Sequence, residues 1–227
     1  GLVGSEMCIR DRNFIDGLDG LVAGVVLIGT TVFFAYSYLL AMETSPTNYF
    51  NLASLLSAIV IGMCVGFLPL NWHRAKIFMG DSGAMLLGLL MATSALTVTG
   101  QIDPYSISRG EIIPAFIPLI LPLAILVLPL LDFALAVIRR LRAGKSPFAA
   151  DRDHLHHRLQ DFGHSHLGSV FVFYLWTALI SLSCLAFFFF DIGIVSLFTS
   201  LGLAGCLIFT LWPSLKRRLR ALSVIHI

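Results

Sequence analysis

Residues 139–157 read RRLRAGKSPFAADRDHLHH, a basic stretch that separates two long apolar parts of the chain. Its last seven residues, 151–157, contain three histidines, two aspartates and an arginine. That density is unusual in a chain of 227 residues of which 57% are hydrophobic and only 12% are charged. A soluble domain carries about 25% charged residues. Together with a mean hydropathy of +0.89, the low charge predicts an integral membrane protein.

Apolar runs long enough to cross a bilayer as helices lie on both sides of this stretch. We expect six of them, so the predicted fold class is an all-α, polytopic transmembrane helix bundle. The fourth run contains Pro114, Pro118 and Pro122, one every four residues, which predicts a kinked or broken helix. A break that faces a groove and a simple packing kink remain alternatives. The six runs cover residues 20–41, 52–70, 83–100, 113–138, 168–190 and 192–213.

The distribution of lysine and arginine predicts how these spans are oriented. The loops 71–81 and 139–167 and the C-terminal tail are basic, whereas the loops 42–51 and 101–112 carry little positive charge. The positive-inside rule places the basic segments in the cytoplasm. With six spans, residues 13–19 fall on the same side. Every polar cluster of interest is therefore expected at the cytoplasmic face.

The first polar cluster, residues 13–20, reads NFIDGLDG. Asp16 and Asp19 are three residues apart and share one face if a helix starts here. Gly17 and Gly20 let the backbone approach a ligand closely, and Asn13 adds an amide. The pair of carboxylates could hold a divalent cation or accept hydrogen bonds from a polar ligand. The alternative is a turn that caps the following helix.

The second cluster, residues 76–83, reads KIFMGDSG. Asp81 lies between two glycines directly before an apolar helix, a position that suits a metal or phosphate site at a helix N-terminus. A simple helix cap explains the spacing equally well. The functional interpretation depends on this cluster lying on the same side as the others.

The third cluster is the histidine-rich end of the basic stretch. His154, His156 and His157, with Arg152 and Arg158, can hold phosphate oxygens through charge-assisted hydrogen bonds. The spacing of His154 and His157 leaves zinc open, and a solvated loop that only sets topology is a further alternative. Carboxylates opposite a basic loop suit Mg²⁺-dependent phosphoryl transfer, and the membrane setting implies that one substrate is a lipid.

Four stretches, in this order, resemble motifs of the polyprenyl-phosphate N-acetylhexosamine-1-phosphate transferases of glycosyltransferase family 4: NFIDGLDGL, KIFMGDSG, PLLDFALAVIRRLRAGKSPFAADRDHLHHRL and GHSH. The resemblance covers residues 13–168. It implies that a UDP-sugar gives its sugar-1-phosphate to undecaprenyl phosphate and releases UMP, with Mg²⁺ or Mn²⁺ required. It also implies a place in the bacterial inner membrane and a role in starting cell-wall, lipopolysaccharide or teichoic-acid synthesis.

The resemblance assigns roles by match to the motifs. Asp81 would be a metal ligand, and Asp16 and Asp19 would join it as catalytic residues. Phe78 would stack on uracil. The remaining substrate-binding residues implied are Asn13, Gly17, Arg152, His154, His156, His157 and Arg158.

The partners implied are a UDP-sugar, undecaprenyl phosphate and the membrane, with no nucleic acid and with a homodimer left open. The form HLHHRL resembles the branch that transfers N-acetylglucosamine-1-phosphate, of the undecaprenyl-phosphate GlcNAc-1-phosphate transferase type. The related phospho-MurNAc-pentapeptide translocase of peptidoglycan synthesis remains the alternative.

Two other classes fit less of the sequence. The CDP-alcohol phosphotransferases share an aspartate motif, DxxDGxxAR, but Gly24 stands where its arginine belongs and no GxxxDxxxD follows. A transporter or structural membrane protein would carry ionisable residues in the middle of a span, and Asp132 is the one candidate, near the end of its run.

We expect a membrane transferase domain over residues 13–222. Residues 1–12 have neither helical nor strand periodicity, and residues 223–227 follow no closing pattern, so both are expected to be foreign. The family has further spans before the first motif and an aspartate pair in an earlier cytoplasmic loop. Residues 1–12 do not match that pair.

The 227 residues alone are therefore expected to lack transferase activity, because the earlier aspartate pair helps to bind metal or to activate the lipid phosphate in the family. The measurement is Mg²⁺-dependent release of UMP from UDP-GlcNAc by the purified chain with undecaprenyl phosphate. Detectable turnover would contradict this expectation.

Overall fold

All regular secondary structure in the described part of the chain is helical, and this part contains no strand. The long helices are α2 (Leu21–Thr44), α3 (Leu52–Asn71), α4 (Gly80–Thr99), α7 (His166–Ala186) and α8 (Ile192–Ile225). The computed structural model describes residues 18–44, 51–99, 120–123, 134, 137–139, 141, 142, 144, 159 and 163–225, with side chains as far as residue 213. The predicted all-α class is confirmed.

Five of these helices are long and apolar enough to cross a membrane. They correspond to five of the six predicted spans. The remaining one, 113–138, lies mostly outside the described residues, although residues 120–123 within it are helical. Several boundaries differ from the prediction: α2 ends at Thr44 instead of residue 41, α7 ends at Ala186 instead of residue 190, and α8 continues to Ile225, past residue 213. Helix α4 begins at Gly80 instead of residue 83, so Asp81 lies in the first turn of the helix and not before it. Small and acidic residues are tolerated there because the first turn has unpaired N–H groups.

Helix α2 lies at the centre of the bundle. It packs against α3, α4 and α7, while α8 packs mainly against α7. Half of the α2 span is buried, compared with 11% of the α8 span. Its inward side chains, among them Val25, Phe33 and Tyr36, form the main apolar core with residues of α7 such as Phe173. The exposed apolar surface of the other helices is what a lipid-facing helix presents.

Polar side chains join α2 to α3 near the far end of α2. Asn51 caps α3, because its side-chain oxygen accepts hydrogen bonds from the Ser54 backbone N–H at 2.8 Å and from the Ser54 hydroxyl at 2.8 Å. The hydroxyls of Ser54 and Ser37 lie 3.2 Å apart. In an apolar setting such hydroxyls need partners, since unsatisfied groups cost free energy.

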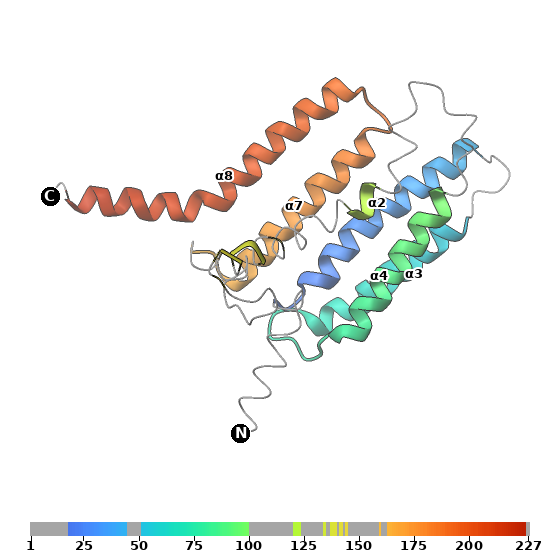
Figure 1. Cartoon of the computed structure of the whole chain (residues 1–227), viewed down its shortest axis with the longest axis horizontal. Coiled ribbons are helices and arrows are strands. Elements are labelled where there is room, and N and C mark those ends of the chain that lie inside the picture. Colours follow the sequence, from blue (N-terminus) through green and yellow to red (C-terminus); the bar gives the residue numbers. More distant parts are fainter. Residues whose placement is uncertain are drawn as a thin grey trace.

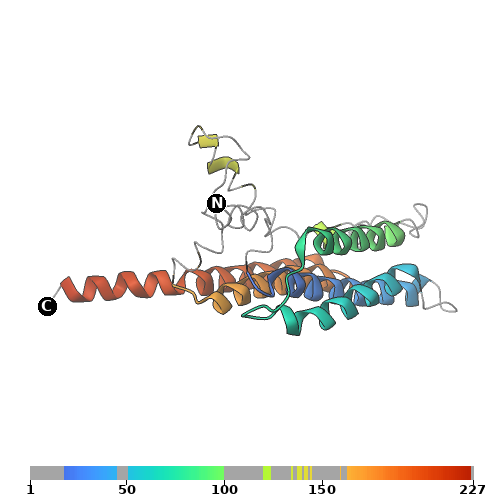
Figure 2. The same cartoon turned by 90° about the horizontal axis from the view of Figure 1, so that it is seen from below.

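The helices run roughly along one common direction (Figures 1 and 2), and α2, α4 and α7 all begin at the same end of the bundle (Figure 1). Helix α8 changes direction along its length and extends beyond the others towards the C-terminus (Figure 1); Pro213 lies inside it. A proline within a helix removes a backbone hydrogen bond and favours a bend. Of the first polar cluster, Asp19 and Gly20 lie against the 71–81 loop, as predicted, while residues 13–17 lie outside the described residues.

Helices α2 and α7 touch where Gly24 meets Tyr174. A Cβ atom at Gly24 would lie 2.0 Å from the Tyr174 hydroxyl oxygen. That hydroxyl donates a hydrogen bond of 2.6 Å to the backbone oxygen of Gly20. Tyr174 therefore cannot move aside without losing this bond, and only glycine fits at position 24.

We expect Gly24→Ala to destabilise the protein by about 1–3 kcal/mol, the usual cost of overpacking. The measurement is the thermal unfolding midpoint of the purified protein in detergent. Gly62→Ala in α3 is the matched control, because a Cβ there meets nothing within 4 Å and alanine favours helix. Equal midpoints for the two variants would contradict the packing argument.

Candidate functional site

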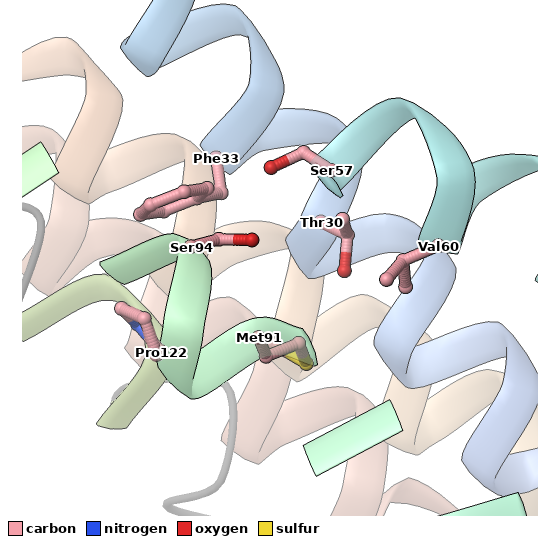
Figure 3. Close-up of a pocket in the computed structure, with 7 residues that line it drawn as sticks. All are labelled: Thr30, Phe33, Ser57, Val60, Met91, Ser94 and Pro122. Carbon is pink, nitrogen blue, oxygen red and sulfur yellow. The ribbon is translucent and has the colours of Figure 1, made fainter. Parts of the chain in front are cut away.

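One small cavity lies among the described residues of the bundle. Between α2, α3 and α4 the described residues enclose a cavity of about 10 Å³, which is near the lower limit for one water molecule. The buried hydroxyl of Thr30, which Figure 3 shows beside this space, has no hydrogen-bond partner among the described residues. The cavity is lined by Thr30, Phe33, Ser57, Val60, Met91, Ser94 and Pro122 (Figure 3). This cavity is too small for a nucleotide or a lipid chain.

The polar groups gather instead at the end where α2, α4 and α7 begin. The last residue of α3, Asn71, is 2% exposed. Its side-chain oxygen accepts a hydrogen bond of 2.9 Å from the Gly20 backbone N–H. Its side-chain nitrogen donates one of 2.9 Å to the backbone oxygen of Ile77. One amide thus holds the turn before α2 against the loop before α4.

The loop between α3 and α4 is folded back onto α3 and onto Asp19. The backbone N–H groups of Lys76 and Ile77 donate to the Leu70 carbonyl at 2.8 and 3.4 Å. The carboxylate of Asp19 accepts from the backbone N–H groups of Arg74 and Ala75 at 3.1 and 3.3 Å.

Arg74 has a φ of 65°, the one non-glycine residue with positive φ in the described part of the chain. A left-handed conformation costs a residue with a side chain about 1–2 kcal/mol. The hydrogen bond from its N–H to Asp19 helps to offset this cost, so the loop shape and the aspartate position depend on each other.

Helix α7 completes this end of the bundle. Tyr174 reaches Gly20 through its hydroxyl, and His166, the first residue of α7, lies beside His73 with ring centroids 5.0 Å apart. The ligand atoms of Asp19, His73 and His166 all lie within 4.8 Å of one another. The turn, the loop and the start of α7 therefore meet at one place.

Three of the predicted site residues lie in the described part of the chain. Asp19 is half-buried and oriented by backbone N–H groups. Phe78 is 58% exposed, in the loop directly before α4, and Asp81 is exposed in the first turn of α4. The other predicted residues lie outside the described residues: Asn13, Asp16, Gly17, Arg152, His154, His156, His157 and Arg158.

Sequence reasoning assigned no role to Asn71 or His73, and none to His166 although the GHSH motif, residues 163–166, contains it. A signal for Asn71 was present, because it is a polar residue at the end of an apolar run and close to the second cluster. The two histidines are far apart in the chain, and nothing in their local sequence indicates that they meet.

This arrangement can do two things chemically. The oriented carboxylate of Asp19 and the exposed ring of Phe78, at the edge of a helix bundle, can bind a polar, planar ligand from solution. The first turn of α4 adds unpaired N–H groups and the positive end of the helix dipole, which favour negatively charged groups.

Comparison with known proteins supports a specific family. Residues 7–99 match the family described as Glycosyl transferase family 4. This match includes Asp19, Asn71, Phe78 and Asp81. No solved structure matches the chain.

The chain is also similar to curated relatives. It is 39% identical over 209 residues to the decaprenyl-phosphate N-acetylglucosaminephosphotransferase of Mycolicibacterium smegmatis, covering 92% of this chain and 52% of the relative. It is 38% identical over 174 residues to a probable undecaprenyl-phosphate N-acetylglucosaminyl 1-phosphate transferase of Bacillus subtilis (76% and 43% covered). It is 35% identical over 178 residues to the phospho-N-acetylmuramoyl-pentapeptide-transferase of Acetivibrio thermocellus (78% and 46% covered). The chain spans about half the length of the curated relatives it matches.

The Asn71 amide makes a testable contribution to stability. We expect Asn71→Ala to lower the free energy of unfolding by about 1–3 kcal/mol, because the Gly20 N–H and the Ile77 carbonyl lose their partner. Lys76→Ala is the control, since Lys76 is exposed and uses only its backbone N–H. The thermal midpoint in detergent is the measurement. A midpoint for Asn71→Ala that equals that of Lys76→Ala would show that the amide does not hold the two segments.

Proposed function

Because the chain belongs to glycosyl transferase family 4, we propose that the complete protein transfers N-acetylglucosamine-1-phosphate from UDP-GlcNAc to a polyprenyl phosphate. In this reaction an oxygen of the lipid phosphate attacks the phosphorus that carries the sugar. The bond from that phosphorus to the oxygen of UMP breaks, and UMP leaves with the electron pair. The products are UMP and a polyprenyl-diphosphate sugar.

The observation that carries the proposal is the meeting of two motif segments at one end of the bundle. Asn71 joins the turn that contains Asp19 to the loop that contains Phe78, and Asp81 follows in the first turn of α4. A UDP-sugar presents a planar base, a ribose and a diphosphate. An exposed ring, an oriented carboxylate and a helix N-terminus suit these three parts respectively.

In the proposed site the protein binds and orients the two substrates, and none of its own residues forms a covalent bond to them. Phe78, with its exposed face, stacks on uracil. Asp19, Asn13 and Gly17 line the nucleotide. The five basic residues of the third cluster hold phosphate oxygens, because charge-assisted hydrogen bonds to phosphate are short and strong: Arg152, His154, His156, His157 and Arg158.

The family implies Mg²⁺ or Mn²⁺, and the donors present fit that class of ion. Asp81 offers an exposed carboxylate, and hard divalent cations prefer oxygen ligands. We assign Asp81 as a metal ligand and Asp16 as its companion in catalysis. When bound, the ion neutralises charge on the diphosphate.

The proposed location follows from the distribution of charge. The basic loops and the tail lie on the side of the proposed site by the positive-inside rule. The site then faces the cytoplasm of a bacterium, where UDP-sugars are made, and the lipid phosphate lies at the membrane boundary. Undecaprenyl phosphate is the lipid proposed, although the relatives include a decaprenyl-phosphate transferase as well as an undecaprenyl-phosphate transferase.

The sugar is proposed from the third motif. The form HLHHRL favours N-acetylglucosamine over the muramoyl-pentapeptide. Identity to relatives of the two kinds, 39% and 35%, differs too little to decide between them.

Asp81→Asn tests the proposal in membranes from cells that express the complete native gene. We expect Mg²⁺- and lipid-dependent release of UMP from UDP-GlcNAc to fall at least about 100-fold, because charge stabilisation by a metal is worth several kcal/mol and each 1.4 kcal/mol is a factor of ten. Asp191→Asn is the matched control, since Asp191 is exposed in the turn between α7 and α8 and should leave activity unchanged.

Two results would count against the proposal. Release with UDP-MurNAc-pentapeptide or another UDP-sugar, but not with UDP-GlcNAc, would reassign the sugar. No lipid-dependent release with any UDP-sugar would overturn the transferase assignment.

A further inference from the structure

Three side chains that the proposed reaction does not require as a group meet at one end of the bundle. Asp19 belongs to the turn before α2, His73 to the loop after α3, and His166 to the first turn of α7. Their ligand atoms lie within 4.8 Å of one another. This is a cluster of two imidazoles and one carboxylate, drawn from three separate parts of the chain.

The protein itself holds the carboxylate of Asp19 in place. One oxygen of Asp19, Oδ2, accepts both the Arg74 and the Ala75 N–H groups, at 3.1 and 3.3 Å. Hydrogen bonds to the outer shell of a ligand orient it and are typical of built metal sites. The second oxygen, Oδ1, takes part in neither of these two bonds. It can therefore serve as the ligand atom.

The imidazoles provide an independent indication. The rings of His73 and His166 lie 5.0 Å apart and are tilted by 39°. The Nε2 atom of His166 is buried and has no hydrogen-bond partner among the described residues. Buried polar atoms nearly always have a partner, and a metal ion is one way to satisfy a ring nitrogen.

Ligand chemistry narrows the class of ion. Two imidazole nitrogens and one carboxylate oxygen suit Zn²⁺, whereas Mg²⁺ prefers oxygen ligands only. Ligands about 2.0–2.2 Å from a tetrahedral Zn²⁺ lie about 3.4 Å from each other. The ligand atoms now lie up to 4.8 Å apart, and the exposed side chain of His73 can rotate towards the other two ligands. A water molecule would occupy the fourth position.

We propose that Asp19, His73 and His166 bind a divalent transition-metal ion of the zinc class, at a site separate from the Mg²⁺ ligand assigned to Asp81. The ion would join the turn before α2, the 71–81 loop and the start of α7. It would thereby fix the loop that carries Phe78. The site depends on contacts within the described residues and not on the proposed activity.

The test uses the 227-residue chain, purified in detergent with its tag removed and stripped of metal by a chelator. Zn²⁺ is titrated against a chromophoric competitor, and the thermal midpoint is measured with and without Zn²⁺. We expect one tight site and a higher midpoint with Zn²⁺, because an ion that binds only the folded state stabilises it. Mg²⁺ at the same concentration should not displace the bound Zn²⁺.

Two ligand variants and two controls make the result specific. His73→Ala and His166→Ala should each weaken Zn²⁺ affinity by at least about 100-fold, since even changes in the outer shell cost about 10–100-fold, and should lose the rise in midpoint. His164→Ala should keep both, because the His164 ring nitrogen is already paired with the Thr210 carbonyl at 3.0 Å. A variant with His154, His156 and His157 all replaced by alanine should also keep the site.

His73 is exposed in a loop, so its variant should fold, and circular dichroism would confirm its helix content. Unchanged Zn²⁺ affinity in His73→Ala would overturn the proposal. So would the absence of tight Zn²⁺ binding by the unaltered chain, or loss of the site in the triple histidine variant.

Discussion

The side-chain amide of Asn71 is the interaction on which the rest of the candidate site depends. It is buried at the end of α3 and uses its oxygen for the Gly20 N–H and its nitrogen for the Ile77 carbonyl. Both partners are backbone groups, so the amide fixes main chain and not merely side chains. A buried amide without hydrogen-bond partners costs free energy. Asn71 therefore stabilises the turn and the loop, and its own burial depends on both segments supplying partners.

The central helix α2 also fixes where the site lies. Helix α2 begins directly after Gly20 and is packed by α3, α4 and α7. The close contact of Gly24 with Tyr174 sets the distance between α2 and α7. The tyrosine hydroxyl donates a hydrogen bond to the Gly20 carbonyl. Apolar packing within the bundle and polar contacts at its end therefore act on the same few residues. That coupling explains how a site made from loops can be held in a defined shape.

A site at the end of a helix bundle suits chemistry between a water-soluble and a lipid substrate. Within the bilayer the backbone must satisfy its own hydrogen bonds, which leaves helices and little freedom for irregular loops. At the boundary, loops can fold back on themselves, as residues 72–79 do here, and can present carboxylates and imidazoles to water. The proposed transferase activity and the proposed zinc-class site both use this boundary and share Asp19, while His73 and His166 belong to the zinc-class site alone.

The sequence by itself determined the class of fold, the ranges of five helices and the family, because bilayer-length apolar runs and short motifs are local patterns. It also indicated Asp19 and Asp81, since carboxylates beside glycines are visible in the chain, and the family resemblance added Phe78. Tertiary structure alone decided that Asn71 bridges Gly20 and Ile77, that Arg74 adopts a left-handed conformation against Asp19, and that His73 meets His166. These pairings join residues from separate helices and loops. No local periodicity specifies them, because they arise only when the packing of α2, α3 and α7 brings three distant ends together.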